Sequence, residues 1–426
     1  MLATESMPMK QGVSLAHALC QAVADDAGVR ALFLKGPTAG QQRLRSTTHV
    51  SGDVDVLCLP EDLAAMEAGL RARGWRLRPV STAAREFTTH SVTYIHDSWP
   101  CDIDLHTNFP GMLADPSASF EALWSSREEH SFAGVPAMTP NRTAQFLVLL
   151  LHGLRSPGLA RNTHEIATAQ TMYHDGLTDD ERADLRALVV ATGSAEPTQD
   201  FFRRVGDPID VPARPSVGYA LWQLKTGPSR TESWMLLALR TRGKQRLRVL
   251  FRAVVPTRAD MYADHPESAQ GFTRLVSAHR HRLSRAARLA PRAVRQILRA
   301  RQALRSTQPV VPGRLLSVVE DAGANSRLSH SSPSRTTAPM VAPHAAEWTD
   351  DQQILFVLPL HSPTSKVLAL RDTAAALWTL IQDTGTSPEQ LASAACLHWQ
   401  IPADTVRPDV EVFLSQLVDW GALVAA

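Results

Sequence analysis

Over the first third of the chain, strand-like apolar runs alternate with stretches of helical pattern, which predicts a sheet domain over residues 1–140. A helical pattern at 13–27 leads into the strand-like run "RALFLKG", and "VSGDVDVLCL" (50–59) predicts a second strand before the helical "PEDLAAMEAGLRARG". The stretch "SVTYIHDSWPCDIDLHTNF" predicts two strands joined at Asp97 to Pro100, because aspartate, serine and proline favour turns. This order of elements indicates an α/β or α+β domain.

Helical periodicity dominates residues 141–305. The helix that begins "NRTAQFLVLLLHGL" has Asn141 or Thr143 as its candidate N-cap. Proline lacks a backbone N–H, so we expect Pro291 to break or restart the last, arginine-rich helix.

Composition changes sharply beyond this helical part. Residues 306–345 are rich in serine, proline, threonine and alanine and lack periodicity, which predicts a disordered linker. Periodicity returns over 346–426, where the strand-like runs "QQILFVLPL" and "KVLAL" precede three helical patterns. The second of these helices begins at Ser387, with proline at the first helical position. The C-terminal region is therefore predicted to be a separate small domain.

Overall composition narrows the functional classes. The chain of 426 residues is long enough for more than one core, and its 44% apolar content is ordinary for a globular protein. The longest apolar run, "FLVLLL", is too short to span a bilayer, so no membrane partner is expected. The first residues lack the pattern of a secretory signal, which favours the cytoplasm. The four cysteines form no CxxC pair, which argues against a zinc site or a disulfide framework.

Two carboxylates interrupt the apolar strand at 50–59. Alternation places Asp53 and Asp55 on one face of this strand, where unpaired buried charges are costly. The later run "CDIDLH" has the same spacing with Asp102 and Asp104. If the two strands are neighbours in one sheet, the carboxylates cluster, and a hard divalent cation such as Mg²⁺ or Mn²⁺ would compensate them.

A turn upstream of this strand carries features that suit an anion. "LFLKGPTAG" ends a strand at Lys35 and Gly36 and then becomes helical, which presents backbone N–H groups and a positive dipole end. A phosphate-binding turn, a DxD strand and a later carboxylate are together what nucleotidyl transfer requires. In this reaction two metal ions act together. One binds the triphosphate and the other activates the attacking hydroxyl, while the third carboxylate holds the second metal or takes the proton of that hydroxyl.

These motifs resemble those of the uncharacterised nucleotidyltransferase-like family of the polymerase-β superfold. "LFLKG", "GDVDVL" and "DIDLH", followed by a helical half ending "RLRVLFRAVVPTRADMYADHP", carry the resemblance over about residues 10–305. It implies a mixed sheet with flanking helices. It also implies that Asp53 and Asp55 are catalytic metal ligands, with Asp104 as the third catalytic and metal-binding carboxylate.

The resemblance also implies a nucleoside triphosphate substrate, with ATP as the expected one. Its phosphate contacts would come from Lys35, Gly36 and Thr38, which replace the family's usual Gly-Ser turn. Residues 40–51 lack the arginine-aromatic pattern expected before the DxD motif.

Several neighbouring residues keep alternative interpretations. Asp102 rivals Asp104, because alternation places both on one face. His106 is either a substrate contact or a structural histidine. His152, on a very apolar helix, is interpreted as a core or interdomain histidine rather than a ligand, and the case for a ligand role is weaker again for His164 and Glu165.

The C-terminal region resembles the PqqD-like pyrroloquinoline quinone peptide chaperone family, a fold also called the RiPP recognition element. "LRDTAAALWTLI", "TSPEQLA" and "DVEVFLSQLVDWGALV" carry this resemblance over about residues 347–426. It implies three strands packed on three helices in a winged-helix-like domain, which binds the leader segment of a ribosomally made precursor peptide by adding a strand to its sheet edge. The helix from Thr405 to Trp420 would form the other wall. The accepting edge would be Lys366, Val367, Leu368, Ala369 and Leu370.

The predicted fold class is thus α+β, and the chain is expected to have four regions. These are a nucleotidyltransferase sheet domain (1–140), its helical part (141–305), a disordered linker (306–345) and a PqqD-like peptide-binding domain (346–426).

Nucleic acid is not expected as a partner. The arginine-rich stretch 274–305 lacks interleaved aromatics and has an apolar side, so we interpret it as an amphipathic helix with a solvated face. Attraction of nucleic acid or nucleotide phosphates, or transient docking on the acidic C-terminal domain, is the other interpretation of this face. The C-terminal domain itself is acidic and therefore poorly suited to phosphate backbones.

The sequence therefore predicts a Mg²⁺-dependent nucleotidyltransferase of peptide natural-product biosynthesis that transfers a nucleoside monophosphate to a recruited precursor peptide. Two alternatives stay open. One is a transferase acting on a small molecule or another protein, as an antitoxin or resistance factor would, and the other is a non-catalytic peptide-binding adaptor.

Overall fold

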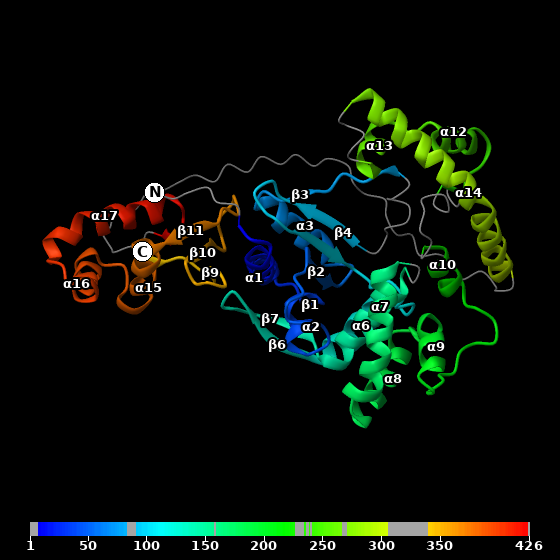
Figure 1. Ribbon diagram of the computed structural model, residues 1–426, viewed down its shortest axis with the longest axis horizontal. Helices are drawn as coiled ribbons and strands as arrows, with labels where there is room; N and C mark the ends of the chain where they lie inside the picture. The colour runs from blue at the N-terminus through cyan, green and yellow to red at the C-terminus, as the bar shows by residue number, and fades with distance from the viewer. Residues whose placement is uncertain are drawn as a thin grey trace. The chain divides into compact units, whose positions relative to one another are not determined.

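The computed structural model describes residues 7–82, 91–156, 159–225, 234–235, 238, 241–265, 271–305 and 340–424 (Figure 1). Internal contacts divide the chain into two units. Unit 1 comprises Met1–Ala303 and Pro343–Ala375, and unit 2 comprises Leu304–Ala342 and Ala376–Ala426. The predicted disordered linker lies outside the described residues, apart from 340–345.

A mixed five-stranded sheet forms the centre of unit 1. Its order is β1-β2-β5-β4-β3, in which β2 and β5 are parallel and the other neighbours are antiparallel. The predicted turn at Asp97 to Pro100 joins the antiparallel strands β4 and β5, as expected. The strands are β1 (Ala31–Leu34), β2 (Asp53–Cys58), β3 (Arg76–Leu77), β4 (Ser91–Ile95) and β5 (Asp102–His106).

Two helical layers cover the faces of this sheet. Val54 and Val56 pack in a core with helices α1 and α3, whereas Leu57 points the other way and packs with α6. Because side chains alternate along a strand, Asp53 and Asp55 lie on the α6 face. The elements of this part are α1 (Met9–Ala27), α2 (Gly36–Gln41), α3 (Leu63–Ala72), α5 (Pro116–Ser125), the hairpin β6 (Arg127–Phe132) and β7 (Val135–Pro140), and α6 (Arg142–Leu154).

All elements that the structure describes from α6 to residue 305 are helices, as the sequence predicted. Asn141 is the N-cap of α6, and its side chain accepts a hydrogen bond from the backbone N–H of Ala144 at 2.9 Å. The expectation that Pro291 breaks the last helix is wrong, because α14 runs through it among residues of high helix propensity. The helices are α7 (Ala160–Thr171), the π-helix η1 (Met172–Gly176), α8 (Asp179–Ala191), α9 (Ala195–Arg204), α10 (Val217–Lys225), α12 (Gly243–Val254), α13 (Arg258–Asp264) and α14 (Phe272–Arg305).

The C-terminal region contains the predicted three-stranded sheet and three helices. Its sheet order is β11-β10-β9, with both pairs antiparallel. Ser387 is the N-cap of α16, as expected, since its hydroxyl accepts from the N–H of Gln390. The elements are β8 (Met340–Val341), β9 (His344–Trp348), β10 (Ile354–Pro359), β11 (Leu368–Arg371), α15 (Asp372–Thr384), α16 (Pro388–Trp399), α17 (Ala403–Asp419) and β12 (Leu423–Val424). Within the described ranges, none of the helices combines the length and apolar character needed to cross a bilayer.

The β9–β11 sheet packs on α1 within unit 1. Ala345, Phe356 and Leu358 belong to the same apolar core as α1 and one face of the five-stranded sheet. On the surface of α1, the Ser14 hydroxyl donates to a Glu347 carboxylate oxygen at 2.9 Å. The contacts therefore place the unit boundary after β11, whereas the composition changes at 346.

A second set of contacts fixes the other end of this small sheet. The indole N–H of Trp99 donates to the Ser365 carbonyl at 2.9 Å, and the Ser365 hydroxyl donates to the Arg73 carbonyl at 2.7 Å. Ser365 is 1% exposed, so these polar groups are paired in a dry environment. Strand β11 begins three residues further on.

A buried histidine of α1, His17, packs against Phe33 of β1, the strand next to the DxD strand. His17 is 1% exposed and stacks on Phe132, with ring centroids 4.3 Å apart. Its ring Nδ1 lies 2.7 Å from the Val13 carbonyl, so Nδ1–H donates there. Burial lowers the pKa of His17 to about 4, although this hydrogen bond and the carboxylates of Asp55 and Asp53 act in the opposite direction.

We predict that His17 makes the fold sensitive to mild acid. Its folded-state pKa lies below the ordinary value, so the unfolded chain takes up a proton first as the pH falls through about 6.5. Between about pH 8 and pH 5 this costs about 2 kcal/mol of unfolding free energy. The variant His17→Asn keeps a donor for Val13 but does not titrate. Urea unfolding should therefore show that the variant loses less unfolding free energy than the wild type over this pH range. Equal losses in both proteins would assign the effect to other titratable groups.

Candidate active site

The register of β2 and β5 brings the two acidic motifs together. Asp53 lies opposite Asp102, and Asp55 lies opposite Asp104. The two strands are therefore neighbours, as the carboxylate cluster requires. Because the register is in phase, the acids share one face with His106, which follows Asp104 by two residues.

Asp55 is compensated by two side chains of the protein. It is 3% exposed, and its Oδ2 lies 2.7 Å from the Lys35 ammonium. Its Oδ1 lies 2.8 Å from the Nε2 atom of His106. Burial acts to raise the pKa of Asp55, but the charge of Lys35 and the hydrogen bond of His106 outweigh it and hold that pKa well below its usual range. The charge at Asp55 is thus already balanced by protein groups.

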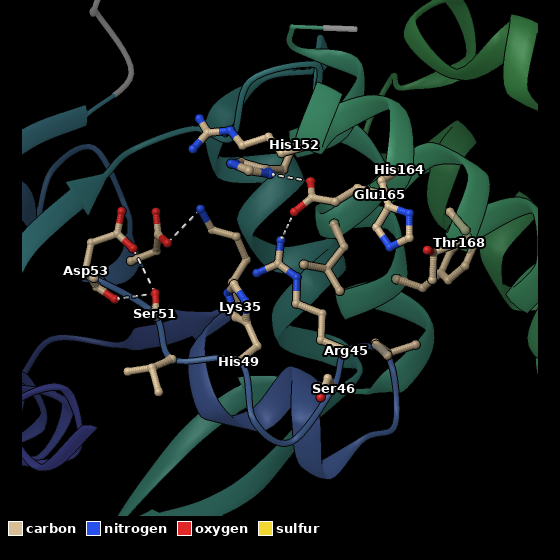
Figure 2. Close-up of a pocket in the computed structure, with 18 of the residues that line it drawn as sticks. Lys35, Arg45, Ser46, His49, Ser51, Asp53, His152, His164, Glu165 and Thr168 are labelled. Atoms are coloured by element: carbon tan, nitrogen blue, oxygen red, sulfur yellow. Dashed lines mark hydrogen bonds and ion pairs between the residues drawn. The ribbon is translucent and has the colours of Figure 1, made fainter. Parts of the chain in front are cut away.

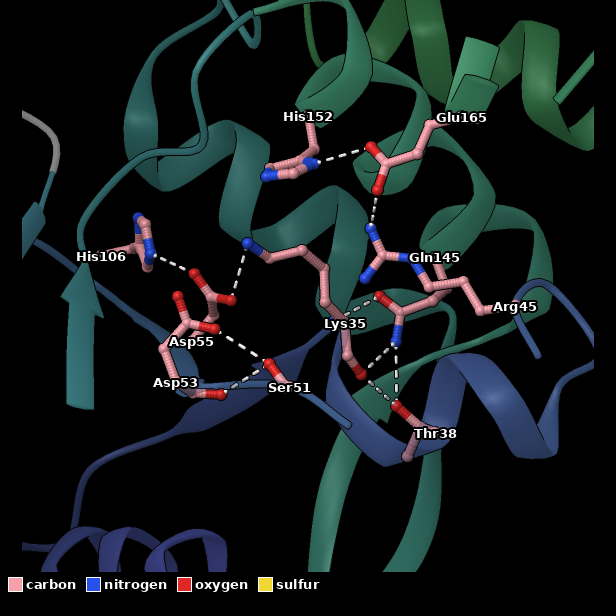
Figure 3. Close-up of polar contacts among 10 residues, drawn as sticks. All are labelled: Lys35, Thr38, Arg45, Ser51, Asp53, Asp55, His106, Gln145, His152 and Glu165. Carbon is pink, nitrogen blue, oxygen red and sulfur yellow. Dashed lines mark hydrogen bonds and ion pairs between the residues drawn. The ribbon is translucent and has the colours of Figure 1, made fainter. Parts of the chain in front are cut away.

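The backbone at Lys35 is held in an uncommon conformation. Its φ is 59° and its ψ is −132°, which is costly for a residue with a Cβ. Gln145 of α6, fully buried, accepts from the Lys35 N–H at 2.9 Å and donates to its carbonyl at 3.3 Å. Gln145 also donates to the Thr38 hydroxyl at 3.0 Å, and that hydroxyl donates to the Lys35 carbonyl at 2.8 Å. Figure 3 shows this network beneath the ammonium.

Gly36 allows a close approach of α1 to this turn. Its φ is 59°, and a Cβ there would lie 3.1 Å from the Nε2 atom of His17. A side chain at this position would combine backbone strain with a tight contact. The glycine of the LKG motif is therefore explained by conformation and packing.

Asp104 has an unsatisfied oxygen. Its Oδ1 is buried and has no hydrogen-bond partner among the described residues. Burial raises the pKa of Asp104, although a hydrogen bond from Thr93 opposes the shift. Ligand atoms of Asp55, Asp104 and His106 all lie within 4.8 Å of one another, as a bound cation would require.

Asp53 and Asp102 lie nearer the opening. The Ser51 hydroxyl donates to Asp53 Oδ1 at 2.9 Å, and Asp102 is ion-paired with Arg78. Of the two rivals on β5, Asp104 is thus the one in the buried cluster, and Asp102 is the one that lines the pocket next to it.

A pocket of about 710 Å³ opens over these carboxylates. Lys35, Asp53, Asp55 and Asp102 line one side, whereas Gly36 and Thr38 are not among its lining residues in the described chain. The opposite side is formed by the loop after α2 and by helices α6 and α7, and it carries basic and imidazole groups (Figure 2). The basic and imidazole groups are those of Arg45, His49, His152, Arg161 and His164, and Glu165 adds a carboxylate beside them.

Glu165 joins two elements across this second side. One of its oxygens accepts from Arg45 at 2.7 Å, and the other lies 3.1 Å from the Nδ1 atom of His152. Burial acts to raise the pKa of Glu165, but the His152 hydrogen bond and the Arg45 charge hold it below its usual value. Glu165 is therefore an ionised carboxylate that orients an imidazole.

Sequence analysis missed much of this second side. His152 was interpreted as a core or interdomain histidine, yet it lines the pocket and its side chain is 25% exposed. Arg161, His164, Glu165 and Thr168 recur at helical spacing on one face of α7 and all line the pocket. That spacing was a signal in the sequence. Gln145 gave no such signal, because it is a single polar residue in an apolar helix.

Comparison with known families supports the two regions separately. Residues 14–165 match the model of an uncharacterised nucleotidyltransferase family, and residues 357–423 match that of coenzyme PQQ synthesis protein D (PqqD). The predicted fusion is confirmed: the chain combines a nucleotidyltransferase domain of α+β fold with a PqqD domain.

Whole-chain comparisons add little to these family matches. A search of curated proteins finds no match. The solution structure of the antibiotic-resistance factor ANT(2'')-Ia, which reveals substrate-regulated conformation dynamics, is 17% identical, with coverage of 46% of this chain and 99% of that chain. Its TM-score of 0.30 carries no argument about function.

We predict that the charges of Lys35 and Asp55 are energetically coupled, so that removal of the lysine charge alone strongly destabilises the fold. Lys35→Met removes the ammonium and keeps most of the side-chain volume, which leaves a buried carboxylate without its main compensation. The expected cost is about 3–5 kcal/mol of unfolding free energy at neutral pH. In urea unfolding, the double variant Lys35→Met/Asp55→Asn should regain much of this loss. Additive costs in the double variant would contradict the coupling.

Proposed function

We propose that this protein transfers a nucleoside monophosphate from a nucleoside triphosphate, with ATP as the expected donor, to a precursor peptide during peptide natural-product biosynthesis. The observation that carries the proposal is the presence, in one chain, of a matched nucleotidyltransferase domain with a carboxylate-lined pocket and a matched PqqD domain. Such a reaction consumes nucleoside triphosphates and is therefore expected in the cytoplasm.

The chemistry of the donor set fits a hard divalent cation. Carboxylate oxygens are the ligands that Mg²⁺ and Mn²⁺ prefer, and Asp104 has a buried oxygen that lacks a partner among the described residues. We assign metal binding to Asp53, Asp55 and Asp104. Bound there, the cation would neutralise triphosphate charge and favour ionisation of the acceptor.

Within the phosphate-binding turn, we propose a direct phosphate contact for Lys35 and an indirect role for Gly36 and Thr38. The Lys35 ammonium lies at the pocket and is oriented by Asp55, so it is positioned to contact a phosphate beside the carboxylates. Gly36 and Thr38 would act through the turn, since Thr38 is fully buried and bonded to Gln145.

Recruitment of the peptide is proposed at the β11 edge of the small sheet. Strand β11 is terminal in the order β11-β10-β9, whereas the opposite edge is engaged by the β6–β7 hairpin, where Ala346 donates to the Ala133 carbonyl at 3.1 Å. An extended leader segment would add to β11 along Lys366, Val367, Leu368, Ala369 and Leu370. This edge belongs to unit 1 and is thus joined to the catalytic sheet by the contacts of α1.

Mass spectrometry tests the transfer. We expect a precursor peptide encoded in the same gene cluster to gain one nucleotide unit when incubated with the full chain, Mg²⁺ and ATP. Asp53→Asn should abolish the gain, because it removes a metal ligand that is not part of the Lys35 pair. Asp97→Asn, which changes an exposed acid paired with Arg76, is the matched control and should keep it. Transfer to small molecules or to other proteins, with none to the peptide, would refute the proposed acceptor.

Hydrogen–deuterium exchange tests the peptide site. Added leader peptide should slow amide exchange over residues 366–370, because strand addition pairs backbone groups at that edge. The same peptide should leave exchange in β1, at the edge of the five-stranded sheet, unchanged. Protection elsewhere in the C-terminal region, with none at 366–370, would move the binding site away from β11.

A further inference from the structure

The second side of the pocket contains an imidazole held by a carboxylate. His152 lies on α6 and Glu165 on α7, and Nδ1 of the former is 3.1 Å from Oε2 of the latter. Glu165 is held in turn by Arg45, whose Nη2 atom is 2.7 Å from Oε1. All three residues line the same pocket as Asp53 and Asp55.

This arrangement selects one tautomer of His152. An ionised carboxylate accepts hydrogen bonds only, so Nδ1 must carry the proton and donate it to Glu165. The Nε2 atom then presents a lone pair, and no hydrogen bond occupies it in the part of the chain that the structure describes. Figure 3 shows the ring edge opposite Glu165 directed toward the side of the pocket that holds Lys35 and Asp55.

Other groups at the pocket are less suited to accept a proton. Asp55 is engaged by Lys35 and His106, and Asp102 by Arg78. Asp53, Asp55 and Asp104 are assigned to the metal above, where the bound cation would disfavour their protonation. A base from the opposite side of the pocket remains, and of the three imidazoles that line it, His49, His152 and His164, His152 is the one that contacts an orienting carboxylate among the described residues.

We propose that His152 is the catalytic base of the transfer, with Glu165 and Arg45 as positioning residues, and that the acceptor group is a hydroxyl. This inference rests on the proposed function. A peptide can accept the nucleotide on a hydroxyl, a phosphate or a carboxyl group, and a phosphate or carboxylate is already ionised at neutral pH and needs no base. An aliphatic hydroxyl, such as that of serine or threonine, holds its proton and does need one.

The step balances with groups already named. The acceptor O–H bond breaks, and its proton passes to Nε2 of His152 while the acceptor oxygen forms a bond to the α-phosphorus of the nucleotide. The bond from that phosphorus to the bridging oxygen of the β-phosphate breaks, and pyrophosphate leaves with the electron pair. Glu165 stabilises the imidazolium that results.

Kinetics of the full chain test the base. With ATP, Mg²⁺ and the precursor peptide, His152→Ala should lower kcat by about 10²- to 10⁴-fold and leave the KM for ATP within about threefold of wild type. Added imidazole should restore part of the lost turnover. Glu165→Gln, which still accepts from Nδ1–H but carries no charge, should lower kcat by about tenfold. His174→Gln, an exposed histidine outside the pocket, is the control and should be unaffected.

The outcomes separate this inference from the proposed function. Turnover of His152→Ala within about threefold of wild type, or a loss confined to the KM for ATP, would overturn the base assignment and leave the transfer intact. Modification of a phosphate or carboxyl group by the wild-type protein would do the same.

Nuclear magnetic resonance of ¹⁵N-histidine-labelled protein gives a readout that needs no activity. The neutral ring of His152 should show a protonated Nδ1 and an unprotonated Nε2, with assignment from the His152→Gln spectrum. The opposite tautomer would overturn the inference even if no peptide acceptor is ever modified.

Discussion

The buried charge of Asp55 organises the catalytic region of this protein. A carboxylate at 3% exposure requires compensation, and the fold supplies it from two directions, with the Lys35 ammonium at 2.7 Å and His106 at 2.8 Å. To deliver the ammonium, Lys35 adopts a backbone conformation that costs about 1–3 kcal/mol in isolation. Gln145 stabilises that conformation through hydrogen bonds with both the N–H and the carbonyl of Lys35. The sheet site is therefore incomplete without helix α6.

The same helix links the carboxylate side of the pocket to the imidazole side. His152 lies seven residues after Gln145 on α6, two turns along one face, so one rigid element positions both the lysine turn and the proposed base. Glu165 then ties this helix side to the loop of Arg45. Because Asp55, His152 and Glu165 sit on a strand and two helices, their separation is set by packing of the core rather than by loop conformation.

The sequence predicted the sheet acids better than the pocket that surrounds them. Asp53, Asp55, Asp102 and Asp104 were recognised because alternation in a strand is a local pattern, and only their pairing had to be assumed. The pairing of Lys35 with Asp55 depends on the antiparallel register of β1 with β2, and the backbone of Lys35 depends on a glutamine far away in the chain, which no local pattern encodes. The α7 residues could have been found from their spacing.

The attachment of the β9–β11 sheet to α1 was also beyond prediction. The composition of residues 306–345 suggested a tethered domain. The strands are instead fixed by a shared apolar core and by polar contacts of single side chains such as Ser14, Trp99 and Ser365, which no local pattern marks. Delivery of a peptide bound at β11 would therefore depend on a fixed attachment behind the catalytic sheet, rather than on the reach of a flexible linker.

The charge balance of strands β2 and β5 bears on the proposed cation. Strands β2 and β5 carry four carboxylates. Lys35 is paired with Asp55, and Arg78 is paired with Asp102. Two negative charges then have no cationic partner in the described structure, at Asp53 and Asp104, and burial disfavours the charged form of Asp104. One divalent cation would neutralise this pair. A second would need further negative charge, which the protein does not offer on these strands and a nucleoside triphosphate would bring. Under the proposed function, the acids would thus suit one metal ion, and any second metal would arrive bound to the substrate.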